Sequence, residues 1–240
     1  MIGIGTIINS VGIIAGGLFG LCVGGLFRRE QQESIQKACG LSVIFISIAG
    51  AMEGMLEIDG TSISSGRSML VVLCLVIGTI IGELIGIEGA LEGFGQWLKL
   101  KSGNARDAQF VDAFVTATMT VCVGAMAIVG SIQDGLLGDI STLVAKTILD
   151  CAIVAIMSSS MGKGAIFSAI PVFVFQGGIS FLAALISPIF TSTAISNLSL
   201  VGSALIFCVG VNLIWGKKFN VANMLPSMVL AVGAAYLPWG

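Results

Sequence analysis

The stretch IGIGTIINSVGIIAGGLFGLCVGGLF, residues 2–27, decides the fold class. It contains no Asp, Glu, Lys or Arg, and only Thr6, Asn9 and Ser10 interrupt its apolar and glycine-rich character. A helix needs roughly 17–25 mostly apolar residues to cross the hydrocarbon core of a bilayer. No Lys or Arg precedes the stretch, so it lacks the charged start of a signal peptide, and we expect it to remain as a membrane-spanning helix.

The composition of the whole chain favours the same interpretation. Of the 240 residues, 56% are hydrophobic and 10% are charged, whereas soluble domains carry about 25% charged residues. So few charged residues could not cover the surface of a water-soluble fold. The lipid bilayer is therefore the expected partner for most of the surface. The net charge is −2 and no basic run occurs, so no nucleic-acid partner is expected. The chain has no histidine and no CxxC pair, so we expect no metal site and no cofactor.

Apolar segments of sufficient length recur along the chain and predict an all-α, polytopic membrane helix bundle of about eight spans. These are Ile2–Phe27, Gly40–Leu56, Ser68–Gly86, Asp112–Ile132, Ser141–Ser160, Ala165–Ser187, Asn197–Trp215 and Ala222–Leu237. Met161–Gly164 predicts a tight turn between the fifth and sixth spans. Ile87–Leu100 mixes apolar and charged residues and predicts an amphipathic helix at the membrane interface.

The distribution of basic residues predicts the orientation of these spans. With the N-terminus outside, the outer loops hold only Arg67, and the cytoplasmic loops hold Arg28, Arg29, Lys37, Lys99, Lys101, Arg106, Lys163, Lys217 and Lys218. Cytoplasmic loops of membrane proteins are enriched in Lys and Arg. We therefore predict a multi-pass protein of the inner or plasma membrane with both termini outside.

A shift of about 160 residues predicts an internal repeat. It aligns three short matches in order, which are residues 16–19 with 177–180, 35–50 with 195–210 and 68–71 with 227–230. The second unit starts five spans after the first, so it would lie upside down relative to the first, as in many secondary transporters. Residues 1–240 would then form one membrane domain, with repeat units 1–90 and 165–240 linked by the spans at 110–160. Chance recurrence of glycine-rich packing is the alternative.

Glycines recur every four residues in two of the spans, at Gly12, Gly16, Gly20 and Gly24 and at Gly78, Gly82 and Gly86. Such small-residue faces let helix backbones approach closely in a membrane. They predict either tight packing within the chain or a homodimer through the glycine-rich helices.

Polar side chains at membrane depth are the functional candidates, because burying them in lipid is costly. Asn9 lies in the first span, Glu83 in the third and Gln176 in the sixth. Lys146 and Asp150 lie in the fifth span at i,i+4, so they share a helix face. This pair either neutralises itself to hold the bundle together or takes part in function.

Two glycine-flanked stretches predict broken helices, VGSIQDG at Val129–Gly135 and FQGG at Phe175–Gly178. Unwound backbone at membrane depth occurs where it lines a cavity or is buried in protein, and it often marks substrate sites. An ordinary helix end is the alternative for the first stretch. The predicted substrate or ion site, which has no catalytic residue, comprises Gln133, Asp134, Lys146, Asp150, Gln176, Glu83 and Asn9.

Three of these stretches together resemble a known family. They are CVGAMAIVGSIQDGL at Cys122–Leu136, KTILD at Lys146–Asp150 and FQG at Phe175–Gly177. The chain resembles, over its whole length, the bacterial membrane proteins that carry domain of unknown function 554. Phe175 stands where many members have tyrosine. The resemblance implies a small integral membrane protein suspected of transport, with no established substrate.

Membrane carboxylates, predicted helix breaks and the predicted repeat favour transport of a small solute or ion, coupled to H⁺ or Na⁺. An oligomeric ion channel is one alternative, although no selectivity filter such as TVGYG occurs. A structural or assembly protein of the membrane is the other. An enzyme is not expected, because no catalytic histidine or HExxH motif is present.

Overall fold

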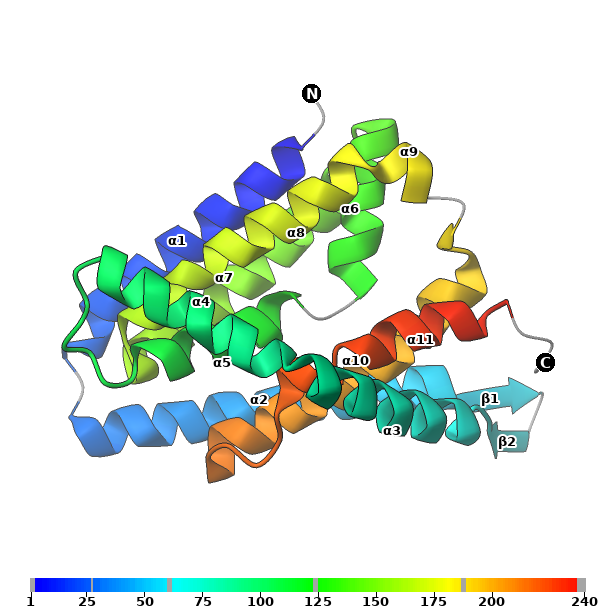
Figure 1. The fold of residues 1–240 in the computed structure, drawn as a ribbon, viewed down its shortest axis with the longest axis horizontal. Coiled ribbons are helices and arrows are strands. Elements are labelled where there is room, and N and C mark those ends of the chain that lie inside the picture. The colour runs from blue at the N-terminus through cyan, green and yellow to red at the C-terminus, as the bar shows by residue number, and fades with distance from the viewer. Residues whose placement is uncertain (1–2, 27, 60–61, 123–124, 187–188, 237–240) are drawn as a thin grey trace.

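The computed structural model describes residues 3–26, 28–59, 62–122, 125–186 and 189–236. Helices dominate it, and one short antiparallel hairpin follows the second helix (Figure 1). In chain order the elements are α1 (Ile4–Gly24), α2 (Arg29–Met55), β1 (Leu56–Asp59), β2 (Ser62–Ser65), α3 (Ser68–Ile85), α4 (Ile87–Lys101), α5 (Phe110–Cys122), α6 (Ala125–Leu137), α7 (Ser141–Met161), η1 (Lys163–Ser168), α8 (Ala169–Phe181), α9 (Ala183–Ile186), α10 (Ser192–Trp215), η3 (Val221–Met224) and α11 (Pro226–Ala234).

The polytopic helical bundle predicted from the sequence is confirmed. Six helical segments of the described chain are long and apolar enough to cross a membrane, namely α1, α2, α3, α7, η1 with α8, and α10. Helices α5 and α6 pass the same test together, although they are bent by 63° relative to each other. The eighth predicted span corresponds to a shorter apolar helix, Val221–Ala234. Among the described residues, six segments, or seven with the bent pair, therefore have the full length of a membrane span, against about eight predicted.

Glycines in the left-handed backbone region end two of these helices. Gly86 has φ 73° and separates α3 from α4, which is the predicted amphipathic helix. Gly162 has φ 91° and ends α7, and η1 begins at the next residue. Only glycine adopts this region without steric cost. The predicted turn between the fifth and sixth spans is confirmed.

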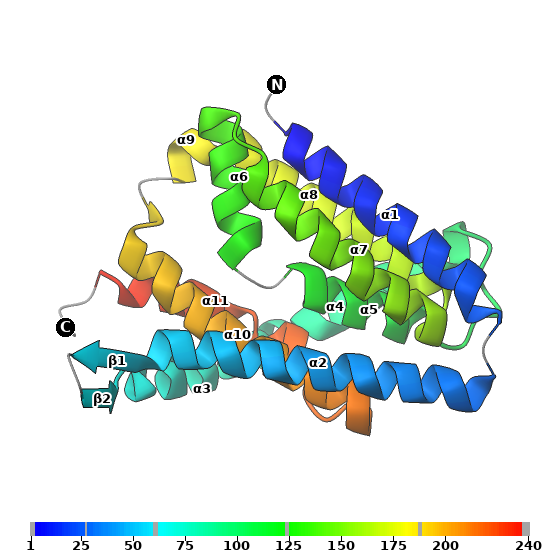
Figure 2. The ribbon, with the colours of Figure 1, turned by 180° about the vertical axis from the view of Figure 1, so that it is seen from behind.

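The helices form two groups (Figures 1 and 2). Helices α1, α6, α7 and α8 lie in one group, and α2, α3, α10 and α11 lie in the other. Helices α4 and α5 lie between the groups, with α4 packed on α5. The chain passes from the first group to the second after α1 and returns to the first group at α6. Residues of α1 therefore contact helices more than 100 positions later in the sequence.

Apolar side chains are exposed on the outside of this bundle, and polar ones are buried inside it. Phe19, Leu84, Phe181 and Val229 are among the many large apolar side chains left exposed. This is the reverse of a water-soluble fold, and it fits a surface that faces lipid.

The glycine faces of α1 and α3 are used for packing inside the chain. A Cβ atom added at Gly16 or Gly20 would collide with the backbone of α7, at Cys151 and Ala155 respectively. One added at Gly78 or Gly82 would collide with the backbone of Ser227 or Asn223. These faces are therefore covered within one chain, and a homodimer stays a prediction that would need another surface.

The two predicted helix breaks are wrong in position. Helix α6 runs without interruption through Val129–Gly135, and α8 does so through Phe175–Gly178. Gly135 instead lets α6 approach α8, because a Cβ atom there would collide with the carbonyl of Ser180. The described chain changes direction between the end of α5 at Cys122 and the start of α6 at Ala125.

Candidate substrate- or ion-binding site

Lys146 and Asp150 form an ion pair inside the first helix group. The Lys146 Nζ lies 2.9 Å from the Asp150 Oδ1, and both residues lie on the same face of α7. Their exposed fractions are 7% and 3%, so the pair is removed from solvent. Each charge lowers the cost of burying the other.

Lys146 also donates a hydrogen bond to the end of a neighbouring helix. Its Nζ lies 2.9 Å from the carbonyl oxygen of Val121, in the last turn of α5. The last carbonyls of a helix have no partner within the helix, and they carry the negative end of its dipole. The bend between α5 and α6 therefore leaves a carbonyl that receives the ammonium group of Lys146.

Asn9 links this pair to a third helix. Its side-chain amide donates to the Asp150 Oδ2 at 3.0 Å and to the Gln176 Oε1 at 3.2 Å. Asn9 and Gln176 are both fully buried. Asn9, Lys146, Asp150 and Gln176 thus form one hydrogen-bonded network across α1, α7 and α8, which we call the Asn9 network.

Asp134 lies close to this network on α6. It is fully buried, and its Oδ2 accepts a hydrogen bond from the backbone N–H of Gly5 at 3.1 Å. Gly5 lies in the first turn of α1, one turn before Asn9. A carboxylate at a helix N-terminus is stabilised by the free N–H groups and by the helix dipole.

Two of the predicted site residues lie apart from this network. Gln133 is half-buried, and its Oε1 accepts a hydrogen bond from the Thr142 hydroxyl at 2.7 Å. Glu83 is exposed on α3 in the second helix group, and Asn220 donates to it at 3.4 Å. The fold brings together Asn9, Asp134, Lys146, Asp150 and Gln176, and neither Gln133 nor Glu83 is bonded to them.

Sequence reasoning missed several buried hydroxyl groups near the network. Thr6 and Ser10 lie on α1 beside Asn9, and Ser180 lies on α8 one turn after Gln176. The hydroxyl oxygens of all three are buried and make no hydrogen bond with the described chain. Their helical spacing from Asn9 and Gln176 is the signal that could have identified them.

A cavity of about 310 Å³ lies between α4, α5 and the end of α10. Its lining includes Glu88, Glu92, Asp112, Thr116, Met119 and Lys217, and we call it the vestibule. Met119 lies on α5, two residues before Val121, whose carbonyl oxygen accepts the hydrogen bond from Lys146. The vestibule and the Asn9 network therefore share α5 as a wall.

Lys217 lines the vestibule and forms ion pairs with two carboxylates of α4. Its Nζ lies 3.0 Å from the Glu88 Oε1 and 2.6 Å from the Glu92 Oε1. Desolvation lowers the pKa of Lys217, but the hydrogen bonds and negative charges of Glu92 and Glu88 outweigh it and raise that pKa above its ordinary value. Lys217 therefore stays charged at neutral pH and joins the α10–η3 connection to α4.

The comparisons with known proteins agree with the resemblance noted in the sequence. The family described as "Protein of unknown function (DUF554)" matches residues 4–236. The chain belongs to this family. The DUF554 relatives include the uncharacterized membrane protein YdfK of Bacillus subtilis (strain 168), which is 26% identical over 94% of this chain and 93% of its own length.

A second relative is the uncharacterized protein YqgA of Escherichia coli (strain K12), which is 26% identical over 98% of each chain. No solved structure matches the chain. The family membership, the membrane protein among the relatives and the apolar helices together make this DUF554 chain a multi-pass membrane protein. Among its described residues, no group of three or more His, Cys, Asp or Glu side chains is placed to hold a metal ion.

Proposed function

We propose that this chain is a secondary transporter, not an enzyme, which moves a small solute or ion across the cell membrane together with H⁺ or Na⁺. The observation that carries the proposal is the Asn9 network, in which an ion pair and two amides are buried where a membrane-spanning segment changes direction. Ionisable groups inside a membrane bundle mark ion and substrate pathways, and interrupted helices supply binding groups in transporters.

Incomplete hydrogen bonding in the network favours ligand binding over simple fastening of helices. The Gln176 Nε2 and the Asn9 Oδ1 are both buried and make no hydrogen bond with the described chain. Each unmatched buried polar group costs about 1–3 kcal/mol. A network that served stability alone would be better completed or replaced by apolar side chains. A bound solute with its own donors and acceptors would complete it.

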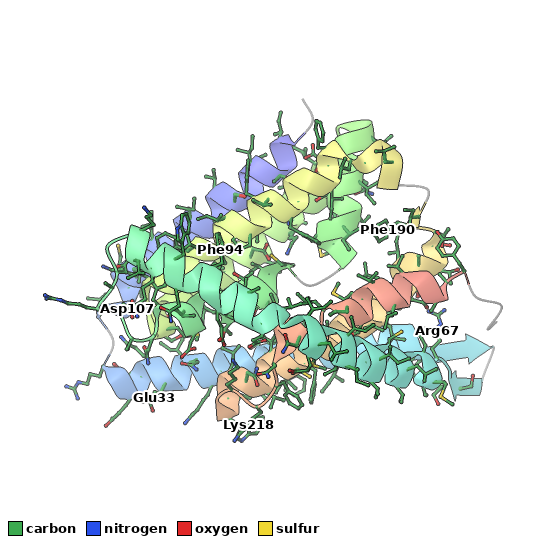
Figure 3. All side chains as sticks on the ribbon, in the orientation of Figure 1. Glu33, Arg67, Phe94, Asp107, Phe190 and Lys218 are labelled. Carbon is green, nitrogen blue, oxygen red and sulfur yellow. The ribbon has the colours of Figure 1, made fainter. Side chains whose placement is uncertain are left out.

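The vestibule supports one-sided access to this site. Its lining includes Gln109 just before α5 and Met161 at the end of α7, and Figure 3 places Asp107 and Glu33 at that end of the bundle, with Arg67 toward the other. Asp112, near the start of α5, is exposed and lines the vestibule, so its carboxylate is available to an entering solute. Access from one side at a time is what a transporter requires.

The predicted inverted repeat agrees with the pairing of helices. A shift of about 160 residues relates α1 to η1 with α8, α2 to α10, and α3 to α11. The two members of each pair lie in contact. Repeats related by a two-fold axis in the membrane plane would pack in this way, with the binding site between them.

Purified protein in liposomes tests the proposal. Charge movement on a solid-supported membrane should follow a step in pH or in Na⁺ concentration, and protein-free liposomes should give no signal. The response should saturate with ion concentration, because binding sites fill. Unsaturable conductance would point to an oligomeric channel. Silence in every gradient would favour a structural or assembly role, and either result would contradict the proposal.

The proposed orientation places both termini outside, and two loop positions test it. Ser102, after α4, should be cytoplasmic, and Gly138, after α6, should be external. Cysteines introduced singly at these positions in a cysteine-free chain should react with a membrane-impermeant maleimide from opposite sides of the cell membrane. Labelling of both positions from the same side would overturn the orientation and, with it, the inverted repeat.

A further inference from the structure

We infer that Thr6, Asp134 and Ser180 form a binding site for a dehydrated monovalent cation of the Na⁺ type. This inference rests on the proposed function, because it assigns the coupling ion and its position. The three residues belong to α1, α6 and α8. They lie about one helical turn from the Asn9 network, on the side of the N-terminus of α1.

The carboxylate of Asp134 has an unmatched oxygen. Its Oδ2 is bonded to the Gly5 N–H, but its Oδ1 is buried without a hydrogen bond among the described residues. Lys146, the buried cation of this helix group, is paired with Asp150. The dipole of α1 compensates only part of the charge on Asp134. A bound cation would complete the neutralisation.

Close helix contacts bring two unmatched hydroxyl groups to the same region. Thr6 follows Gly5, the partner of Asp134, and its methyl group would lie 3.8 Å from a Cβ atom at Gly177 on α8. Gly135, next to Asp134, packs against the carbonyl of Ser180. The Thr6 Oγ1 and the Ser180 Oγ are buried and make no hydrogen bond with the described chain. Three residues with an unpartnered oxygen atom thus lie where α1, α6 and α8 meet.

The ligand types select the class of ion. Carboxylate and hydroxyl oxygens are hard ligands that bind hard cations and do not favour the softer transition metals such as Cu(I) or Zn²⁺. A single carboxylate gives the site one negative charge, which a monovalent cation balances. Ca²⁺ takes 6–8 oxygen ligands, several of them from carboxylates, and Asp134 is the one carboxylate in this group. The Asn9 Oδ1, also unmatched and one turn away, is a further oxygen of the same class.

Cation binding here would act on the Asn9 network through helix spacing. The ion would join α1 at Thr6 to α8 at Ser180, one turn from the place where Asn9 of α1 meets Gln176 of α8. Occupancy of the cation site would hold these two helices at the distance that their amide hydrogen bond requires. This gives a direct route by which a Na⁺ gradient could control solute binding.

Thermal unfolding of the purified full-length chain tests the site. In NaCl the unfolding temperature should rise with ion concentration, relative to choline chloride at the same ionic strength. Asp134→Asn keeps the shape of the side chain and an acceptor for Gly5 but removes the charge, and it should weaken the apparent Na⁺ affinity by at least about tenfold. Thr6→Val and Ser180→Ala should weaken it in the same direction. The matched control is Ser158→Ala, because Ser158 also has a buried hydroxyl without a partner but lies on α7.

Unchanged Na⁺ stabilisation in Asp134→Asn would overturn the site, as would equal effects of Na⁺ and choline on the parent. If Asp134→Asn does not fold, the apparent Na⁺ affinities of Thr6→Val and Ser180→Ala test the site instead, and parent-like affinity in both would overturn it. Flux in liposomes separates this inference from the proposed function. Flux that depends on Gln176 but not on Na⁺ would overturn the cation site alone. Na⁺ stabilisation without any flux would overturn the transport proposal and leave the site standing.

Discussion

Replacing Lys146 by methionine should destabilise the protein by about 3–5 kcal/mol, the usual penalty for breaking a buried ion pair from one side. Asp150 would keep only the hydrogen bond from Asn9 to balance its charge. Asp150→Leu should destabilise the protein comparably, because the ammonium group of Lys146 would be left with the Val121 carbonyl alone. The free energy of unfolding in detergent, from denaturant titration, measures both effects.

The double variant Lys146→Met/Asp150→Leu should be more stable than either single variant. It removes both charges together and leaves neither unpaired in the interior. Additive losses in the two single variants and the double would show that the residues do not interact. Lys217→Met is the matched control, because the Lys217 side chain is 50% exposed in its ion pairs with Glu88 and Glu92. Loss of the solvated pair with Glu92 should cost about 0–1 kcal/mol, and the buried Glu88 carboxylate keeps its hydrogen bond from the Ala222 N–H.

Replacing Gln176 by alanine should abolish ion-driven charge movement in liposomes while the protein still folds. Gln176 is fully buried, and its side chain is joined to the ion pair only through Asn9. Interhelical hydrogen bonds in membrane proteins contribute about 0.6 kcal/mol on average, so the loss of one does not threaten the fold. The unmatched Nε2 of Gln176, by contrast, is a donor that a bound ligand would use.

Asn197→Ala is the control for the Gln176 variant. Asn197 is also a buried amide between helices, and it donates to the Ala231 carbonyl at 3.3 Å in the second helix group. We expect this variant to keep the parent's current and to elute as the parent does. Parent-like current in Gln176→Ala would show that its amide only fastens helices, and the binding site would then lie elsewhere.

Much of the site could be predicted because burying polar groups in a membrane is costly. The i,i+4 spacing placed Lys146 and Asp150 on one face, and the ion pair confirms it. Asn9 was among the predicted site residues, but its partners could not be predicted from local patterns, because it meets Asp150 and Gln176 across 141 and 167 positions of sequence.

The location of the helix break could not be predicted either. Glycine-rich stretches such as FQGG resemble breaks, but glycine in membrane helices also lets neighbouring helices approach. Gly135 packs against α8, so α6 stays intact there. The vestibule ion pairs of Lys217 with α4 depend on the tertiary fold and leave no pattern in the local sequence.

The double variant Lys146→Met/Asp150→Leu also provides the most direct test of the central claim, that the Asn9 network is a binding site and not only a fastener. Its charge movement in liposomes should be measured after a pH or Na⁺ step, on protein that elutes and unfolds as a folded chain. We predict a current no larger than that of protein-free liposomes, because the paired charges that would bind the solute are gone. A folded double variant with the parent's current would contradict the claim.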